Sequence, residues 1–199
     1  AGDLLSEFTL KNSLYGTARN GSQLFGVHTF QNSNTELGLS IAFRNALDKS
    51  LSIGMAFGAS VFVCDNLALY GDVVKFRKHT TNVLQDLEEM ILTGVYRART
   101  SFIHAVDDAN EMKQILISND GAYRALGHLF GHNVLSPRQM PVALKEWHEP
   151  SHVAFEDRSL WSLYNAVTEA LKSSPPQNIL ERHLQLHAHF LPNQERWSA

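Results

Sequence analysis

Cysteine is nearly absent from this chain of 199 residues, which contains only Cys64. A single thiol excludes a disulfide within the chain and a zinc site built from several cysteines. Because proteins of reducing compartments rarely rely on disulfides, the composition predicts a cytoplasmic protein. Cys64 ends an apolar run, so we expect a small buried side chain there rather than a nucleophile.

Long apolar runs and a surplus of positive charge are also missing. The longest apolar run, Met55–Cys64, is far shorter than the ~20 residues that a helix needs to cross a bilayer, which predicts a protein without membrane spans. Lys and Arg number 17 against 20 Asp and Glu, giving a net charge of -3. That balance excludes nucleic-acid binding by bulk charge, although it is compatible with a local basic patch.

Sequence motifs for the common reactions are missing as well. The chain contains no P-loop, no Gly-x-Gly-x-x-Gly loop and no serine-nucleophile motif. The sequence therefore names no reaction and requires no cofactor, and it favours a non-catalytic protein.

What the chain does contain is a two-residue alternation over Leu51–Val63. One set of alternate residues is mostly large and apolar, and the other is mostly Ser, Gly or Ala until Phe62. This period is typical of a β-strand. Because the run is longer than a usual strand, we expect a bend or bulge near Gly54 or Gly58.

Shorter alternating segments flank this strand. Leu37–Phe43 predicts a strand before it, and Val74–Phe76 predicts one after it. Leu14–Ala18 and Gln23–Phe30 predict a hairpin around Asn20-Gly21, because both central residues of a type I′ turn need positive φ. The first 80 residues therefore predict a meander of about five antiparallel strands.

The apolar period changes after Thr80. Apolar residues recur at steps of three and four from Val83 to Val106, which predicts a long amphipathic helix. We expect this helix to cover the small face of the strand at 51–63, because small residues allow close approach. The prediction is an α+β fold forming a single domain over 1–199. Its N-terminal antiparallel β-meander (mainly β over 1–80) is packed by the long helix and followed by a helical C-terminal lobe (mainly α over 81–199).

Three stretches carry a family resemblance. They read R-N-x-x-D-K-S from Arg44, G-x-x-x-G-x-x-V-F-V-C-D-N-L from Gly54, and R-K-H-T from Arg77. With these motifs the chain resembles the bacterial phage/plasmid-like family filed as domain of unknown function 932, over most of its length. The resemblance implies carriage on phages, plasmids or integrated elements, and it implies no reaction.

Polar residues gather where the predicted strands end, at Asp48, Asp65, Asn66 and His79. Asp65 and His79 could form a carboxylate–imidazole pair of the kind that an enzyme uses to fix a histidine tautomer. The alternative is that the acidic and amide residues are turn formers bonded to their own backbone. The sequence leaves both interpretations open.

Basic residues near the same strand ends suggest nucleic acid as a partner. Basic groups beside aromatic rings form platforms for single strands, and a meander followed by a long helix resembles the order of elements in single-strand-annealing recombinases. The candidate contacts to single-stranded nucleic acid are Arg44, Lys49, Lys75, Arg77 and Lys78.

Histidine is frequent, with ten in the chain. His183 and His187 lie four residues apart in a predicted helix, a spacing that lets two imidazoles share a metal ion. The alternative is a polar stripe of neutral histidines on a surface helix. Both interpretations stay open.

These observations favour a phage- or plasmid-associated cytoplasmic accessory protein, non-catalytic and acting on single-stranded nucleic acid. One alternative is an enzyme that uses the region of Asp65 and His79, and another is a metal-binding protein that uses His183 and His187. A third is an assembly protein that forms a homo-oligomer.

Overall fold

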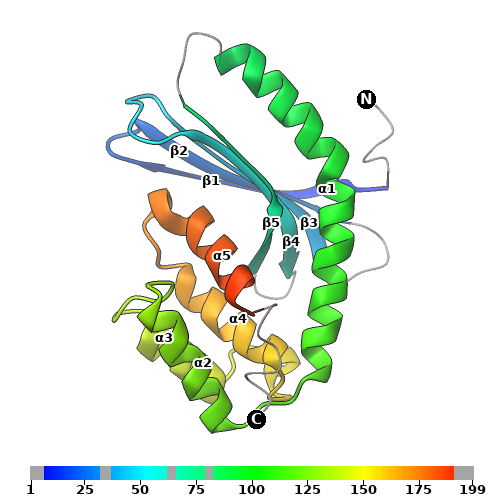
Figure 1. Ribbon diagram of the computed structural model, residues 1–199, viewed down its shortest axis with the longest axis vertical. Coiled ribbons are helices and arrows are strands. Elements are labelled where there is room, and N and C mark those ends of the chain that lie inside the picture. The colour runs from blue at the N-terminus through cyan, green and yellow to red at the C-terminus, as the bar shows by residue number, and fades with distance from the viewer. Residues whose placement is uncertain (1–6, 32–36, 62–65, 79–82, 191–199) are drawn as a thin grey trace. The chain divides into compact units, whose positions relative to one another are not determined.

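The computed structural model describes residues 7–31, 37–61, 66–78 and 83–190 (Figure 1). The chain divides into two compact units, one made of Ala1–Phe62 with Leu69–Ala105 and the other of Val63–Ala68 with Val106–Ala199. The first unit contains most of the strands, and the second contains most of the helices. The predicted α+β class, strands first and helices after, is confirmed.

The five strands form one sheet in the order in which they occur in the chain, and the described pairings, among the first four strands, are antiparallel. Neighbouring strands in sequence are neighbours in space, so the predicted meander is confirmed. Its members are β1 (Thr9–Ala18), β2 (Gln23–Gln31), β3 (Leu37–Ala46), β4 (Ile53–Val61) and β5 (Asn66–Arg77).

The hairpin between β1 and β2 turns one residue earlier than the sequence predicts. Arg19 and Asn20 have φ of 49° and 55°, and the amide of Gly21 donates to the carbonyl of Ala18 at 3.2 Å. The two central residues of the turn are therefore Arg19 and Asn20 rather than Asn20 and Gly21. Gly21 follows with a φ of 85°, a conformation that glycine adopts at little cost.

The described pairing of β4 shows no bulge at Gly54 or Gly58, where the sequence suggested a bend or bulge. The pairing of β3 with β4 runs in unbroken register from Leu37 opposite Val61 to Arg44 opposite Gly54. The described register shift lies instead in β1, between Leu10 and Asn12. Edge strands tolerate such irregularity because only one neighbour must keep its hydrogen bonds.

Helix α1 (Val83–Gln114), drawn in Figure 1, packs within the first unit on the opposite face of β4 from the one expected. A Cβ built on Gly94 would come within 2.2 Å of Cζ of Phe57, and Phe57 belongs to the large apolar face. The ring of Phe102 also meets that of Phe8 edge to face, at 5.4 Å. The large side chains attract the helix because they offer the most apolar area to bury, and Gly94 makes room for Phe57.

The second unit is built around helix α4 (Leu160–Leu171), which is buried along nearly its whole length. Its N-cap is Ser159, whose hydroxyl accepts from the amide of Ser162 at 3.1 Å. The ring of Trp161 stacks on Tyr164. The other elements of this unit are α2 (Asn119–Gly131), α3 (Met140–His148), the 3-10 helix η1 (Val153–Phe155) and α5 (Pro176–Phe190).

A buried amide ties three parts of this unit together. Gln139, which caps α3, is 2% exposed. Its Oε1 accepts from the hydroxyl of Ser136 at 2.8 Å and from Arg182 of α5 at 2.7 Å. Its Nε2 donates to the hydroxyl of Ser174 at 2.9 Å, in the connection between α4 and α5. Because both polar atoms of the Gln139 side chain are hydrogen-bonded, its burial avoids the cost of leaving a buried polar group without a partner.

Candidate functional site

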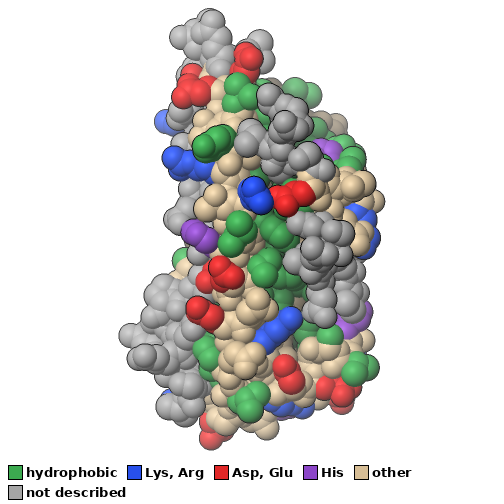
Figure 2. Space-filling view, turned by 90° about the vertical axis from the view of Figure 1, so that its right-hand side faces the viewer, with side chains coloured by type: hydrophobic (Ala, Val, Ile, Leu, Met, Phe, Trp, Pro, Cys, Tyr) green, Lys and Arg blue, Asp and Glu red, His purple; other side chains and the backbone are tan. Residues whose placement is uncertain are grey.

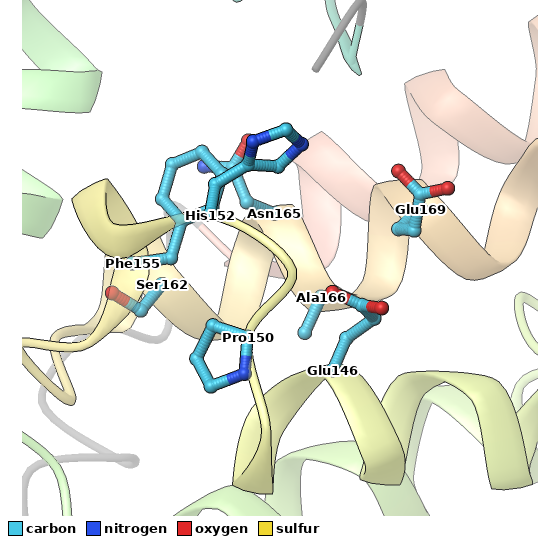
Figure 3. Close-up of a pocket in the computed structure, with 8 residues that line it drawn as sticks. All are labelled: Glu146, Pro150, His152, Phe155, Ser162, Asn165, Ala166 and Glu169. Carbon is cyan, nitrogen blue, oxygen red and sulfur yellow. The ribbon is translucent and has the colours of Figure 1, made fainter. Parts of the chain in front are cut away.

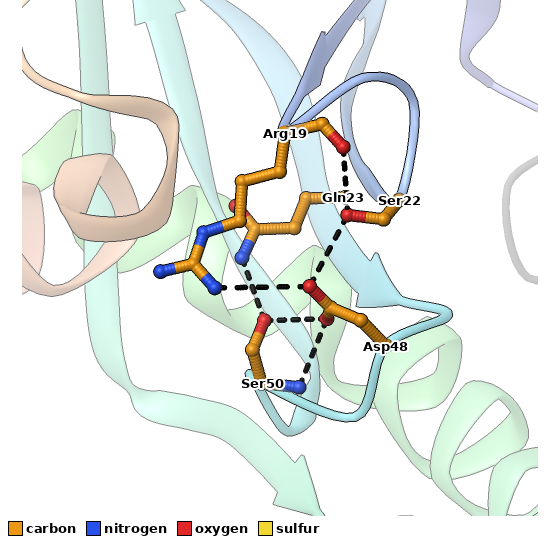
Figure 4. Close-up of polar contacts among 5 residues, drawn as sticks. All are labelled: Arg19, Ser22, Gln23, Asp48 and Ser50. Carbon is orange, nitrogen blue, oxygen red and sulfur yellow. Dashed lines mark hydrogen bonds and ion pairs between the residues drawn. The ribbon is translucent and has the colours of Figure 1, made fainter.

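The loops at one end of the sheet are joined by a polar network around Asp48 (Figure 4). One carboxylate oxygen accepts from the amide of Ser50 at 3.0 Å, and the other accepts from the hydroxyl of Ser22 at 3.1 Å. Arg19 lies 3.7 Å from the same carboxylate. The hydroxyl of Ser50 also donates to the carboxylate, at 2.5 Å. The hydrogen bonds from Ser50, first that from its hydroxyl and then that from its amide, lower the pKa of Asp48. The bond to the Ser50 amide is that of a turn residue capping its own backbone, as one of the two sequence interpretations predicts.

Further bonds fix the loop between β3 and β4 against the hairpin loop. The amide of Leu47 donates to the carbonyl of Ser22 at 2.7 Å, and Nε2 of Gln23 donates to the Ser50 hydroxyl at 2.7 Å. Gln23 is 1% exposed. The loop is therefore held in one conformation by side chains from two neighbouring strands and their connections.

This fixed loop forms one wall of a surface recess. Lys49, Ser50, Leu51 and Ser52 line it together with Lys78, which follows β5. Lys49 has a φ of 58°, a left-handed conformation that is uncommon for a side chain with a Cβ. Both lysines are exposed. Two of the five predicted nucleic-acid contacts thus lie at one recess, beside two hydroxyls that the sequence interpretation did not include.

Arg44 occupies a different position from these lysines. It is 6% exposed, on the face of the sheet that carries the small residues, and its Nε donates to the carbonyl of Ser52 at 3.3 Å. Arg44 therefore supports the backbone of the recess. Its burial places it away from any strand of nucleic acid lying on the surface.

The remaining residues of the two predicted clusters stay untested. Lys75 and Arg77 belong to β5, and Asn66 is its first residue, but their side chains lie outside the described part of the structure. Asp65 and His79 also lie outside the described residues, as does Cys64. The enzyme alternative that depends on Asp65 and His79 therefore stays a prediction.

His183 and His187 are buried, at 2% and 5% exposure, so they do not form the surface stripe offered as the alternative to a metal site. Nε2 of His187 lies 3.5 Å from Oδ2 of Asp108 on α1, and its ring meets that of Tyr164 at 6.3 Å. Burial first, and the negative charge of Asp108 second, raise the pKa of Tyr164. Whether His183 and His187 share a metal ion stays a prediction.

A small pocket in the second unit brings acidic and basic side chains together (Figure 3). Glu146, His152 and Glu169 line it, with Ser162 and Asn165 of α4. Each carboxylate already has a structural bond, because Glu146 accepts from the amide and hydroxyl of Ser151 and Glu169 pairs with Lys172 at 2.6 Å. These contacts cap a loop and a helix end, so the pocket gives no separate reason to assign a reaction.

The surface carries charges of both signs. On the face drawn in Figure 2, acidic and basic side chains are interspersed among polar and apolar ones. This mixture agrees with the net charge of -3. Among the helices in the described part of the chain, none combines the length and the apolarity needed to cross a membrane.

Comparison with known proteins identifies the family and nothing narrower. Neither a curated protein nor a solved structure matches this chain. A family model described as Domain of unknown function (DUF932) matches residues 3–185, which is most of the 199-residue sequence. The match includes the stretches on which the resemblance rested and both units of the fold. The chain therefore belongs to the DUF932 family.

Proposed function

We propose that this chain is a non-catalytic cytoplasmic accessory protein of phages, plasmids or integrated elements that holds single-stranded nucleic acid by its phosphates. The mobile-element association comes from the resemblance of its motifs to phage/plasmid-like proteins. The proposed contact point is the recess lined by Lys49, Ser50, Leu51, Ser52 and Lys78.

One observation carries this proposal: two lysines far apart in sequence line the same recess with two serines. Lys49 and Lys78 are exposed, and they supply positive charge and donors to an anion. Ser52 adds a hydroxyl of the kind that contacts phosphate oxygens, whereas the Ser50 hydroxyl already donates to Asp48 and helps to hold the recess wall. Because phosphate contacts carry no sequence information, the expected binding is tolerant of base sequence.

The rigidity of the loop supports the same interpretation. Asp48, Ser22 and Gln23 hold the recess wall in place through hydrogen bonds of 2.7–3.1 Å. A wall that is already ordered loses less conformational entropy when an anion binds. The lysine side chains themselves remain exposed and can adjust to the backbone of a flexible strand.

An exposed aromatic ring on β1 offers a place for a base. Tyr15 is 62% exposed, although its ring contacts His28 at 5.8 Å and Phe43 at 6.2 Å. These neighbours orient the ring while leaving much of it accessible. Stacking of a base on an aromatic side chain is tolerant of sequence and is worth ~1–3 kcal/mol. Tyr15 lies on the strand that leads into the hairpin loop joined to the recess.

The test is a fluorescence anisotropy titration of a labelled single-stranded oligonucleotide at low salt. We expect Lys49→Ala/Lys78→Ala to weaken binding by about five- to thirtyfold, the equivalent of ~1–2 kcal/mol for two exposed ion contacts. The matched control is Arg138→Ala/Lys145→Ala, which removes the same charge from two exposed positions in the second unit. Equal weakening by both pairs, or no binding by the unmodified protein, would overturn the proposal.

A further inference from the structure

Three histidine side chains from two helices meet in the second unit. His128 lies in the last turn of α2, His132 is the C-cap of that helix, and His189 lies in the last turn of α5. Their ring centroids are 4.3, 4.7 and 5.1 Å apart. The sequence shows the spacing of the first two, but only the fold brings His189 to them.

The nitrogen atoms of two of these rings face each other. Nε2 of His128 lies 3.2 Å from Nδ1 of His189. Two imidazole nitrogens bound to one tetrahedral zinc ion at ~2.1 Å lie about 3.4 Å apart. The observed separation is therefore close to the distance between two ligands of the same ion, and it equally allows a hydrogen bond between neutral rings.

The third ring stands beside this pair. Within the described residues, no three His, Cys, Asp or Glu side chains already surround one point as metal ligands do. His132 contacts both partners through its ring and is exposed. The proposed site requires its side chain to rotate so that a nitrogen turns toward the pair.

We propose that His128, His132 and His189 bind one zinc-class divalent ion, with water completing a tetrahedral shell. Imidazole is a preferred ligand of this class of ion. Three histidines with one open position form a known type of zinc coordination. His128 and His189 are partly exposed, which gives the ion a path from solvent.

The protonation state of the cluster suits a metal ligand. Burial first, and then the neighbouring charges of His132 and His128, lower the pKa of His189. The neutral imidazole is the form that binds metal, because a protonated ring has no lone pair to donate.

Binding would join the end of α2 to the end of α5. Because the folded chain presents the three ligands together and the unfolded chain does not, an ion raises the apparent stability by mass action. This effect gives a readout independent of any activity, and it does not depend on the nucleic-acid proposal.

The test is calorimetric titration of Zn²⁺ into protein that has been treated with a chelator and dialysed. We expect one ion per chain and a higher melting temperature with Zn²⁺. We expect His132→Gln and His189→Gln each to weaken zinc binding at least about tenfold. Tenfold is the lower end of the loss seen when a residue that only supports a metal ligand is changed, and loss of a ligand should cost no less. The control is His152→Gln, a partly exposed histidine of the same unit, which should bind as the unmodified protein does.

Three results would overturn the proposal. The first is no binding by the folded, unmodified protein. The second is equal affinity in the cluster variants and the control, which would indicate adventitious binding. The third is loss of binding in His183→Gln with retention in His189→Gln, which would place the ion at the pair His183 and His187 instead. The circular dichroism spectrum of each variant confirms that it is folded.

Discussion

Cζ of Phe57 lies so close to Gly94 that a methyl group on the helix would meet it at 2.2 Å. Phe57 is fully buried and has little room to move. In Gly94→Ala, overpacking should cost ~1–3 kcal/mol, offset by ~1 kcal/mol of improved helix propensity. We expect a net loss of about 1 kcal/mol in the free energy of unfolding, measured by urea denaturation.

Gly127 provides the control for this substitution. It also lies within a helix, α2, but a Cβ there would meet nothing within 4 Å. Gly127→Ala should therefore raise the free energy of unfolding by up to ~1 kcal/mol. If both substitutions stabilise the protein equally, α1 does not pack on Phe57 as described. Restoration of stability in Phe57→Leu/Gly94→Ala would support the contact.

The buried hydroxyl of Tyr164 should lower the stability of the second unit. Its oxygen has no hydrogen-bond partner among the described residues, while its ring stacks on Trp161. Removing an unpaired buried polar group avoids its desolvation cost, so Tyr164→Phe should raise the free energy of unfolding by about 1 kcal/mol. Denaturant unfolding measures this, and a decrease of similar size would show that the hydroxyl has a bonding partner.

The ionisation of Asp48 reports on the loop that forms the recess. The hydrogen bonds from Ser50 hold the pKa of Asp48 below 3.8, its ordinary value. A lowered carboxyl pKa stabilises the fold above 3.8, and this contribution is lost as pH falls through the folded-state value. An NMR titration should show the low pKa in the unmodified protein and a shift back toward 3.8 in Ser50→Ala. An unchanged pKa in that variant would contradict the network of Figure 4.

The three-histidine cluster makes metal-free stability depend on pH. The pKa of His189 is lowered from 6.5, so below pH 6.5 the unfolded chain binds a proton that the folded chain resists. The free energy of unfolding should therefore fall as pH drops below that value. With chelator present, urea unfolding at pH 7.5 and 5.5 should show a smaller fall in His189→Gln than in the unmodified protein. Equal falls would show that His189 is not perturbed by its neighbours.

Much of the architecture follows from periodicity. The alternation at 51–63 and the change of period after Thr80 correctly predict β4 and α1, because side-chain period reflects backbone geometry directly. The side of the sheet that α1 covers is predicted wrongly, because the small face suggested close approach while the helix packs on the large side chain of Phe57. The close fit of Gly94 to Phe57 joins residues 37 positions apart and appears only after folding.

The positions of the candidate site residues also depend on contacts that the sequence does not show. Lys49 and Lys78 are recognisable as basic residues near strand ends, but the burial of Arg44 depends on which face it occupies in the pairing with Gly54. His183 and His187 have metal-like spacing, yet both are buried. The cluster that the fold assembles adds His189 of α5 to His128 and His132, which lie four residues apart in the sequence. Spacing within one helix cannot reveal a ligand contributed by another.

The salt dependence of single-strand binding tests whether the recess contacts nucleic-acid phosphates. Each phosphate contact to a single strand contributes a slope of about -0.7 in log affinity against log salt, so two lysine contacts predict about -1.4 for the recess. The slope of the unmodified protein should become less negative by about that amount in Lys49→Ala/Lys78→Ala and stay unchanged in Arg138→Ala/Lys145→Ala. Absence of binding, or one slope shared by all three proteins, would contradict the assignment of the recess to nucleic-acid phosphates.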